Sequence, residues 1–257
     1  MSGIRLIAAL ALVAAIGGGC AAKNDVLPVG TVDADKFLFD KGTAAAKDRK
    51  WLNAREYFRN LVDNYPQSPY RPDAKLALGD TYIGEHTTES LLLAANEFRE
   101  FLTFYPTNPR ADYAQLQLAK SYTEQMLAPE RDQSSTKDAV KEIEIFLQRF
   151  PNSPLMPEAR KLEREAKDRL SEASYRVGFF YFRLRYYPGA IDRFREVLTT
   201  DPAYTNRDAV YYHLAESLYQ TKQKPEALPY YERLLREFEK SEYLEATQKR
   251  VTELKSP

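Results

Sequence analysis

The chain has 257 residues, of which 44% are hydrophobic, and its 37 lysines and arginines balance 37 aspartates and glutamates. This balance leaves no net basic field to hold nucleic acid, so nucleic acid is not an expected partner. Only 10 glycines occur, too few for the many tight turns of an all-β protein.

Residues 1–19 have the features of an export signal peptide. Arg5 precedes an apolar run, LIAALALVAAI, which ends at Ile16 and is followed by GGGC. As a helix this run is about 16 Å long, shorter than the ~30 Å hydrocarbon core of a bilayer. A basic start, a short apolar stretch and small residues before a cleavage point are typical of a signal peptide.

The single cysteine, Cys20, directly follows these small residues. Its position resembles that in bacterial lipoprotein signals, where the thiol is lipidated and becomes the first residue of the mature chain, although Gly17 stands where leucine is usual. Ala21 follows without the aspartate that signals inner-membrane retention, which favours the outer membrane. We predict a lipid on Cys20, no other cofactor, and a flexible lipid-anchored tether over residues 20–34. The alternative is a free thiol beside an ordinary cleavage site.

From residue 35 to about 240 the sequence repeats itself. One phrase recurs as NYPQSPY at 64–70, FYPTNPR at 104–110 and RFPNSPL at 149–155. A small residue lies upstream of each of these three phrases, and two more occur towards the C-terminus. They are Gly42, Gly79, Ala119, Gly178 and Ala215. A small residue lets a second helix approach closely, and proline ends that second helix. The pattern predicts an all-α solenoid of five helical hairpins that resemble tetratricopeptide repeats.

One interval in this pattern is longer than the others. The joint proline precedes the next small residue by 13 positions in three repeats, but Pro151 precedes Gly178 by 27. The excess of 14 residues is about 21 Å of helix, and no proline follows Pro157 in this stretch. We predict repeats 1–3 over residues 35–156, with the loop MLAPERDQSST inside repeat 3. One long helix over 157–187 then runs into repeat 4, and residues 188–257 complete repeat 4, repeat 5 and a C-terminal helix.

Catalytic motifs are absent from the sequence. The two histidines, His86 and His213, lie in different repeats, and there is no cysteine pair, HExxH motif or phosphate-binding loop. Carboxylates alternate with lysine and arginine, as in KLEREAKDR, which is typical of a solvated helix face. We therefore expect no metal site and no enzymatic activity.

In tetratricopeptide proteins the first helix of each pair lines a concave face that binds extended or helical peptides. The family's groove positions in repeats 1–3 fall on apolar and charged side chains, which suit a peptide with a hydrophobic face and a carboxylate. They include Phe39, Leu76, Asp80, Ile83, Tyr113, Leu116 and Lys120. The alternative is an ordinary solvated groove without a ligand.

A second candidate surface lies in repeat 4. Tyr175, Phe179, Phe182 and Tyr186 are spaced at i, i+4, i+7 and i+11, with Arg183 beside them, which predicts a continuous aromatic stripe on one helix face. Two interpretations stay open. The stripe packs on the long helix or on repeat 5, or it anchors a partner protein, because tyrosine and arginine dominate such interfaces.

Three segments carry a resemblance to a known family. YPQSPY and FPNSPL match its recurring Y-P-x-S-x-Y phrase, and APERDQSSTKDA resembles its D-R-D-Q segment between the helices of repeat 3. VGFFYFRLRYYPGAIDRF resembles its V-G-x-Y-Y stretch, with Arg193 at the place of an arginine. Together with the lone cysteine, they resemble the outer-membrane β-barrel assembly lipoprotein family of the BamD/ComL type, from about Cys20 to Tyr243.

The resemblance implies a scaffold on the periplasmic face of the outer membrane of a Gram-negative bacterium. Such proteins bind a barrel subunit with periplasmic domains through their C-terminal half, and other assembly lipoproteins are further partners. They are thought to receive the C-terminal signals of unfolded outer-membrane proteins on their N-terminal repeats. By this resemblance Tyr65, Pro66 and Tyr70 belong to the substrate side, and Arg193 couples to the barrel subunit.

Two other classes of protein share parts of the pattern. A periplasmic adaptor that links cell-wall synthesis to the Tol–Pal system also has the Y-P-x-S phrase. That family usually carries an N-terminal coiled coil, for which the stretch from Lys23 to Asp35 is too short. A helical-repeat lytic glycosidase needs an acidic residue in an added domain, for which no room remains.

Overall fold

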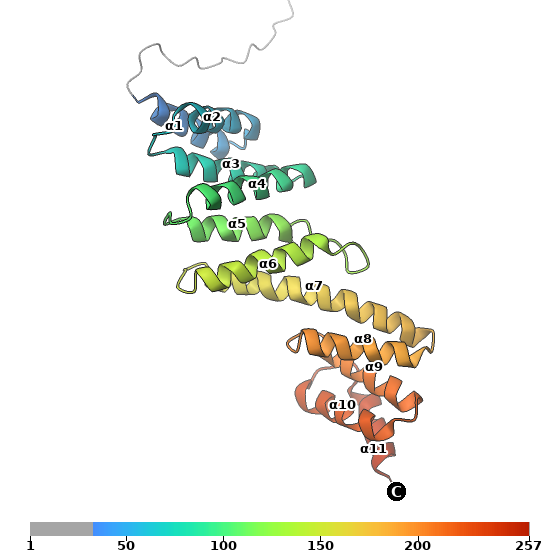
Figure 1. Ribbon diagram of the computed structural model, residues 1–257. Helices are drawn as coiled ribbons and strands as arrows, with labels where there is room; N and C mark the ends of the chain where they lie inside the picture. The colour runs from blue at the N-terminus through green and yellow to red at the C-terminus, as the bar shows by residue number, and fades with distance from the viewer. Residues whose placement is uncertain (1–32, 257) are drawn as a thin grey trace, which may run out of the picture. The chain divides into compact units, whose positions relative to one another are not determined.

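The computed structural model describes residues 33–256, and within this range every regular element is an α-helix (Figure 1). The helices are α1 (Ala34–Lys47), α2 (Trp51–Asn64), α3 (Arg71–Glu85), α4 (Thr88–Phe104), α5 (Ala111–Thr123), α6 (Ser134–Arg149), α7 (Met156–Arg183), α8 (Tyr187–Thr200), α9 (Arg207–Gln220), α10 (Lys224–Glu237) and α11 (Leu244–Lys255). From α2 onward each helix packs on the next one along the chain. The expected all-α class is therefore confirmed, and α1 to α10 follow one another as pairs.

The small residues of the repeat lie where two helices meet. A Cβ atom added to Gly79 would lie 2.5 Å from the ring of Phe98, and one added to Gly178 would lie 2.8 Å from the ring of Phe194. Both rings are fully buried. Any larger side chain at these two glycines would push the second helix of the pair away.

The recurring proline phrase does more than end a helix. In RFPNSPL, Ser153 donates a hydrogen bond to Asp112, in the first turn of the first helix of the same pair, at 2.6 Å. Ser241, at the corresponding place after α10 where the proline is missing, donates to Asp208 of α9 at 2.6 Å. A hydrogen bond from Ser68 likewise lowers the pKa of Asp35. Hydrogen bonds to charged groups contribute about 1.5–3 kcal/mol. These bonds close the open end of three of the hairpins, a role that the sequence pattern did not reveal.

The long helix ends earlier than expected. α7 stops at Arg183 rather than at Tyr187, because Arg185 adopts a φ of 59° and the Tyr186 N–H donates to the carbonyl of Tyr181 at 2.9 Å. This is a Schellman motif, which usually places glycine in the left-handed position. A basic residue takes that place here and also at the ends of α1 and α9, where the φ values of Arg49 and Lys222 are 57° and 63°.

α7 belongs to two stacks of helices. Its first half packs on α6, where Ala166 joins Ala139 and Ile143 in one buried cluster. Its second half packs on α8 and α9, and Ser171 donates to Asp201 at the end of α8 at 2.7 Å. The 28 residues of α7 are twice the 14 of α9. One helix thus closes the first stack and opens the second (Figure 1).

Several expectations fall outside the described residues. The signal peptide over 1–19, the lipidation site Cys20 and most of the tether over 20–34 belong to this part of the chain. α1 begins at Ala34, one position before the expected start of repeat 1. Among residues 33–256, no helix has both the length and the apolar character needed to cross a bilayer.

Candidate partner-binding surfaces

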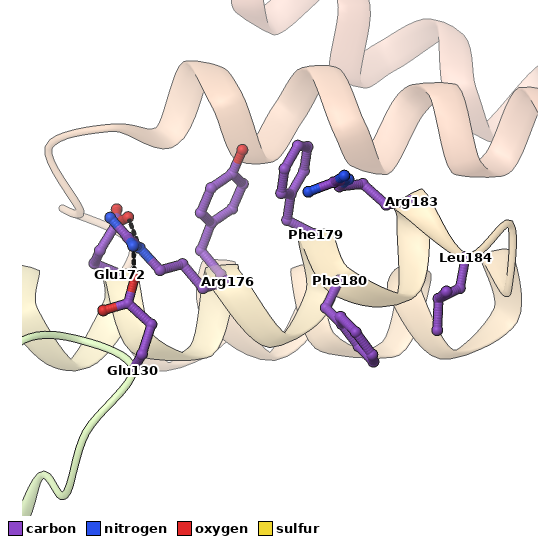
Figure 2. Close-up of a pocket in the computed structure, with 8 residues that line it drawn as sticks. Glu130, Glu172, Arg176, Phe179, Phe180, Arg183 and Leu184 are labelled. Carbon is purple, nitrogen blue, oxygen red and sulfur yellow. Dashed lines mark hydrogen bonds and ion pairs between the residues drawn. The ribbon is translucent and has the colours of Figure 1, made fainter.

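A hollow of about 620 Å³ runs along the C-terminal half of α7 (Figure 2). We call it the α7 groove. Its lining side chains from α7 recur every three or four residues and, at about 100° per residue, cover about half of the helix surface. They are Glu172, Tyr175, Arg176, Phe179, Phe180, Arg183 and Leu184, joined by Glu130 from the loop between α5 and α6. The combination of aromatic rings and arginines is typical of protein–protein interfaces.

The predicted aromatic stripe forms one side of this groove and also packs on repeat 5. Tyr175 stacks on Phe179 at 6.0 Å between ring centroids, and Phe179 stacks on Phe182 at 6.3 Å. Phe179 and Phe182 both meet His213 of α9 edge-on, at 4.9 and 5.0 Å. The stripe therefore holds α7 on α9, while Tyr175 and Phe179 still border the groove.

Two of the predicted interface residues lie elsewhere. Tyr186 follows the end of α7, packs edge-on against Tyr181 at 5.7 Å and is not on the stripe, so that part of the prediction is wrong. Arg193 lies on α8 and pairs with Glu196 at 2.8 Å. Neither residue lines the α7 groove, whereas the predicted Arg183 does.

The most exposed apolar side chains of this region were not predicted. Phe180 is 59% exposed and Leu184 is 61% exposed. Figure 2 shows that both point away from the side of α7 to which Phe179 points. Their spacing was visible in the sequence, but the positions equivalent to Phe180 in α3, α5 and α9 are buried, so the spacing alone could not distinguish a core position from a surface one.

Charge is distributed unevenly along the groove. At one end Arg176 pairs with Glu130 and donates to Glu172 from Nε at 2.6 Å. At the other end Arg183 is exposed and forms no ion pair with any residue in the range 33–256. A ligand that reaches this end with a carboxylate would therefore meet a cation that is not already neutralised.

His213 sits behind the groove in an aromatic environment. It is only 6% exposed, and its Nδ1 lies 2.7 Å from the carbonyl oxygen of Ala209. Burial lowers the pKa of His213, although that hydrogen bond and the charges of Glu216 and Glu242 act in the opposite direction. The neutral imidazole is thus the form that this packing favours.

We expect the stability of the folded chain to decrease as the pH falls below about 6.5, the ordinary pKa of histidine. The unfolded state then binds a proton that the folded state, with its lowered His213 pKa, does not bind. The loss is about 1.4 kcal/mol for each unit by which the pKa is lowered. Urea unfolding between pH 8 and pH 5 measures it. His213→Gln should flatten the profile and His86→Gln, at an exposed site, should not. Equal slopes in all three proteins would contradict the role of His213.

The N-terminal repeats bring together some of the residues predicted for the peptide groove. Phe39 of α1 stacks on Tyr70 at 5.4 Å. Tyr113 of α5 donates its hydroxyl to Asp80 of α3 at 2.8 Å. Burial raises the pKa of Asp80 and raises the pKa of Tyr113 to about 12. Arg110 lies 4.8 Å from the centre of the Tyr113 ring. This face thus presents an aromatic pair and a polar cluster.

Other predicted groove residues do not reach this face. Leu76 is fully buried in the core cluster that contains Phe98, so its assignment to the groove is wrong, and Leu116 is buried as well. Ile83 is half-buried against the same cluster as Leu76. Tyr65 caps the C-terminal end of α2 and is half-buried, and Pro66 is exposed in the turn that follows; both lie in the joint between α2 and α3.

Comparison with known proteins gives two family matches. A family described as "Outer membrane lipoprotein", YfiO, matches residues 32–221, and a tetratricopeptide repeat family matches residues 209–241.

Curated relatives match most of the chain. A Caulobacter vibrioides protein named "Outer membrane protein assembly factor BamD" is 28% identical over 217 residues, covering 81% of this chain and 68% of the relative. Proteins of the same name from Vibrio cholerae and Rickettsia prowazekii are 26% and 27% identical. The matched regions cover 72% and 84% of this chain, and 78% and 81% of the lengths of these two relatives.

Among solved structures, one of MamA has 19% identity and a TM-score of 0.34, covering 82% of this chain and 96% of that one. A tetratricopeptide repeat protein from Parabacteroides merdae has 13% identity and a TM-score of 0.38, covering 86% and 90%.

Proposed function

The chain belongs to the YfiO family of outer membrane lipoproteins, and we propose that it is a scaffold of the outer-membrane β-barrel assembly machinery. The relatives in three bacteria are named as outer membrane protein assembly factors. The chain is accordingly a non-catalytic protein associated with the outer membrane. In our proposal a lipid on Cys20 anchors it, and the repeats lie on the periplasmic side.

The C-terminal half of the chain binds the barrel subunit in this proposal, and the α7 groove is the observation that supports it. The groove combines Tyr175 and Phe179 with Arg183, whose charge has no partner in the described part of the chain. Apolar contacts would then supply most of the affinity, and a carboxylate of the barrel subunit on Arg183 would fix the orientation. Arg193, on the neighbouring helix α8, adds a second contact.

The N-terminal repeats receive C-terminal signals of unfolded outer-membrane proteins. The stacked pair of Phe39 and Tyr70 offers apolar surface, and the joint at Tyr65 and Pro66 lies next to the start of α3. Tyr113 provides a further aromatic ring beside the positive charge of Arg110 (one turn earlier). An extended peptide with a hydrophobic side and a terminal carboxylate fits these groups. Other assembly lipoproteins are further partners.

A pull-down from outer membranes tests this function. The full-length protein carries a C-terminal tag and is recovered in mild detergent from the source bacterium. One large β-barrel protein should co-purify in stoichiometric amount. The double variant Phe179→Ala/Arg183→Glu should reduce its recovery at least tenfold, because it removes both the ring and the charge of the groove.

Lys249→Glu is the matched control, since it reverses an exposed cation of α11, outside the groove. It should leave the recovery of the barrel protein unchanged. Co-purification of cell-envelope linkage proteins without a barrel protein would instead support the Tol–Pal type of adaptor and would overturn the proposal.

A further inference from the structure

First helices inside a stack bury one characteristic face. We call it the stacking face. Two positions of each repeat lie on it: the residue directly before the small residue of the repeat, and the residue two positions after that small residue. In α3, α5 and α9 these residues are at most 2% exposed: Leu78, Leu118 and Leu214, and Thr81, Ser121 and Ser217. The second helix of the preceding pair packs on each of these three helices.

The stacking face of α7 is open. Val177 and Phe180 occupy the two equivalent positions beside Gly178, and they are 42% and 59% exposed. α6, the preceding second helix, packs on the first half of α7 through Leu162 and Ala166. The extra length of α7 carries the second half past α6, so no helix of the described chain takes the place of a preceding pair there.

The residues on this face differ from those at a terminal repeat. α1 opens the first stack, and its equivalent positions are Lys41 and Ala44, in keeping with the polar outer face that terminal repeats need for solubility. On α7 they are Val177 and Phe180, and Leu184 continues the line at i+7. Exposed apolar side chains at i, i+3 and i+7 form a stripe that suits a second helix.

Arginines that form no ion pair within residues 33–256 lie at both ends of this stripe. Arg183 and Arg185 lie at its C-terminal end and make no ion pair with residues 33–256. At the other end Arg169 donates to the carbonyl oxygen of Leu127 at 2.9 Å, which holds an exposed leucine of the α5–α6 loop near α7. An occupant with carboxylates beside its apolar side would complement these arginines.

We propose that an acidic, amphipathic α-helix of a partner protein docks on the stacking face of α7. It takes the place that the second helix of a preceding pair takes on α3, α5 and α9. Phe180 is much larger than the threonine and serines at the equivalent positions, so the partner helix lies farther from α7 than a repeat helix would. This surface is the side of α7 away from Phe179 (Figure 2), and the proposal holds whether or not the chain serves in barrel assembly.

Site-specific photocross-linking in the native membrane tests this docking. The full-length protein carries p-benzoylphenylalanine at Phe180 or, as the control, at Phe104, which is 66% exposed on α4. Position 180 should give an adduct with another protein at least tenfold above position 104. The cross-linked peptide, mapped by mass spectrometry, should be an acidic segment with apolar residues at helical spacing.

Surface variants complete the experiment. With the cross-linker at Val177, Phe180→Ser/Leu184→Ser and, separately, Arg169→Glu/Arg185→Glu should each lower the yield at least fivefold without lowering stability. An adduct that maps to a second copy of this chain, an adduct with lipid alone, or a yield equal to that of position 104 would overturn the proposal. Phe180 and Leu184 also line the α7 groove. The pull-down variant changes Phe179 and Arg183 and leaves these two residues in place, so the two proposals can fail independently.

Discussion

Phe194→Ala is expected to lower the free energy of unfolding by about 3–5 kcal/mol, the usual range for truncating a buried phenylalanine. Phe194 is fully buried and fills the gap above Gly178, where even an added Cβ would lie 2.8 Å from its ring. It also packs on Tyr175 at 5.7 Å and on His213 at 6.1 Å. Its loss leaves a cavity where α7, α8 and α9 meet, because glycine cannot move in to fill it.

Urea unfolding followed by circular dichroism measures this effect. Phe104→Ala is the matched control, since Phe104 is 66% exposed and its truncation should change stability by less than about 0.5 kcal/mol. Because Phe194 supports Tyr175 in the α7 groove, the variant should also weaken partner recovery. A loss of stability below about 1 kcal/mol would mean that α7 and α8 close the cavity without this ring.

Arg250→Met is expected to cost about 2–4 kcal/mol and to loosen α11 from α9. Glu216 is only 7% exposed, and it accepts hydrogen bonds from Nε and Nη2 of Arg250 at 2.8 and 3.1 Å and from Tyr231 at 2.5 Å. Removing the arginine leaves a buried carboxylate without a counter-charge, which typically costs 3–5 kcal/mol; partial exposure of Arg250 reduces the figure.

Hydrogen exchange of α11 and urea unfolding together check this prediction. Arg233→Met removes a more exposed arginine paired with Glu237 and should cost less than about 1 kcal/mol. The double variant Glu216→Gln/Arg250→Met should recover part of the loss, because it removes the buried charge as well. If Arg250→Met and Arg233→Met lowered the free energy of unfolding by the same small amount, the prediction would be contradicted. Water would then solvate the Glu216 carboxylate without the arginine.

The helical hairpins were predictable because their signals are local. Gly79, Gly178 and the joint prolines each impose a steric requirement that any chain with this spacing must satisfy. The length of α7 followed from the same reasoning, since the excess residues between Pro151 and Gly178 contain strong helix formers. Such requirements depend on neighbours within one or two turns, and the sequence displays those neighbours directly.

Features that depend on tertiary packing were not predictable in this way. Leu76 occupies a groove position of the repeat family, yet it lies in the core because the surrounding helices leave it no access to solvent. Tyr186 was placed on α7 because Arg185, in a left-handed conformation, gives no glycine signal for the helix end. The hydrogen bond from Ser153 to Asp112 joins residues 41 positions apart. A pattern of neighbouring residues cannot predict a contact over this separation.

The length of α7 also determines how the second stack of helices is rotated relative to the first. α7 has 14 residues more than α9, and at about 100° per residue they complete almost four turns, about 40° short of a whole number. The rotation of the second stack about the axis of α7, relative to the first stack, is therefore fixed by the number of residues in α7 between the two stacks. One residue inserted near the middle of α7 would rotate the α7 groove by about 100° relative to the peptide face of the first stack. An insertion of seven residues would keep the direction of the groove within about 20° of its original one and would move the groove by about 10 Å along the helix axis.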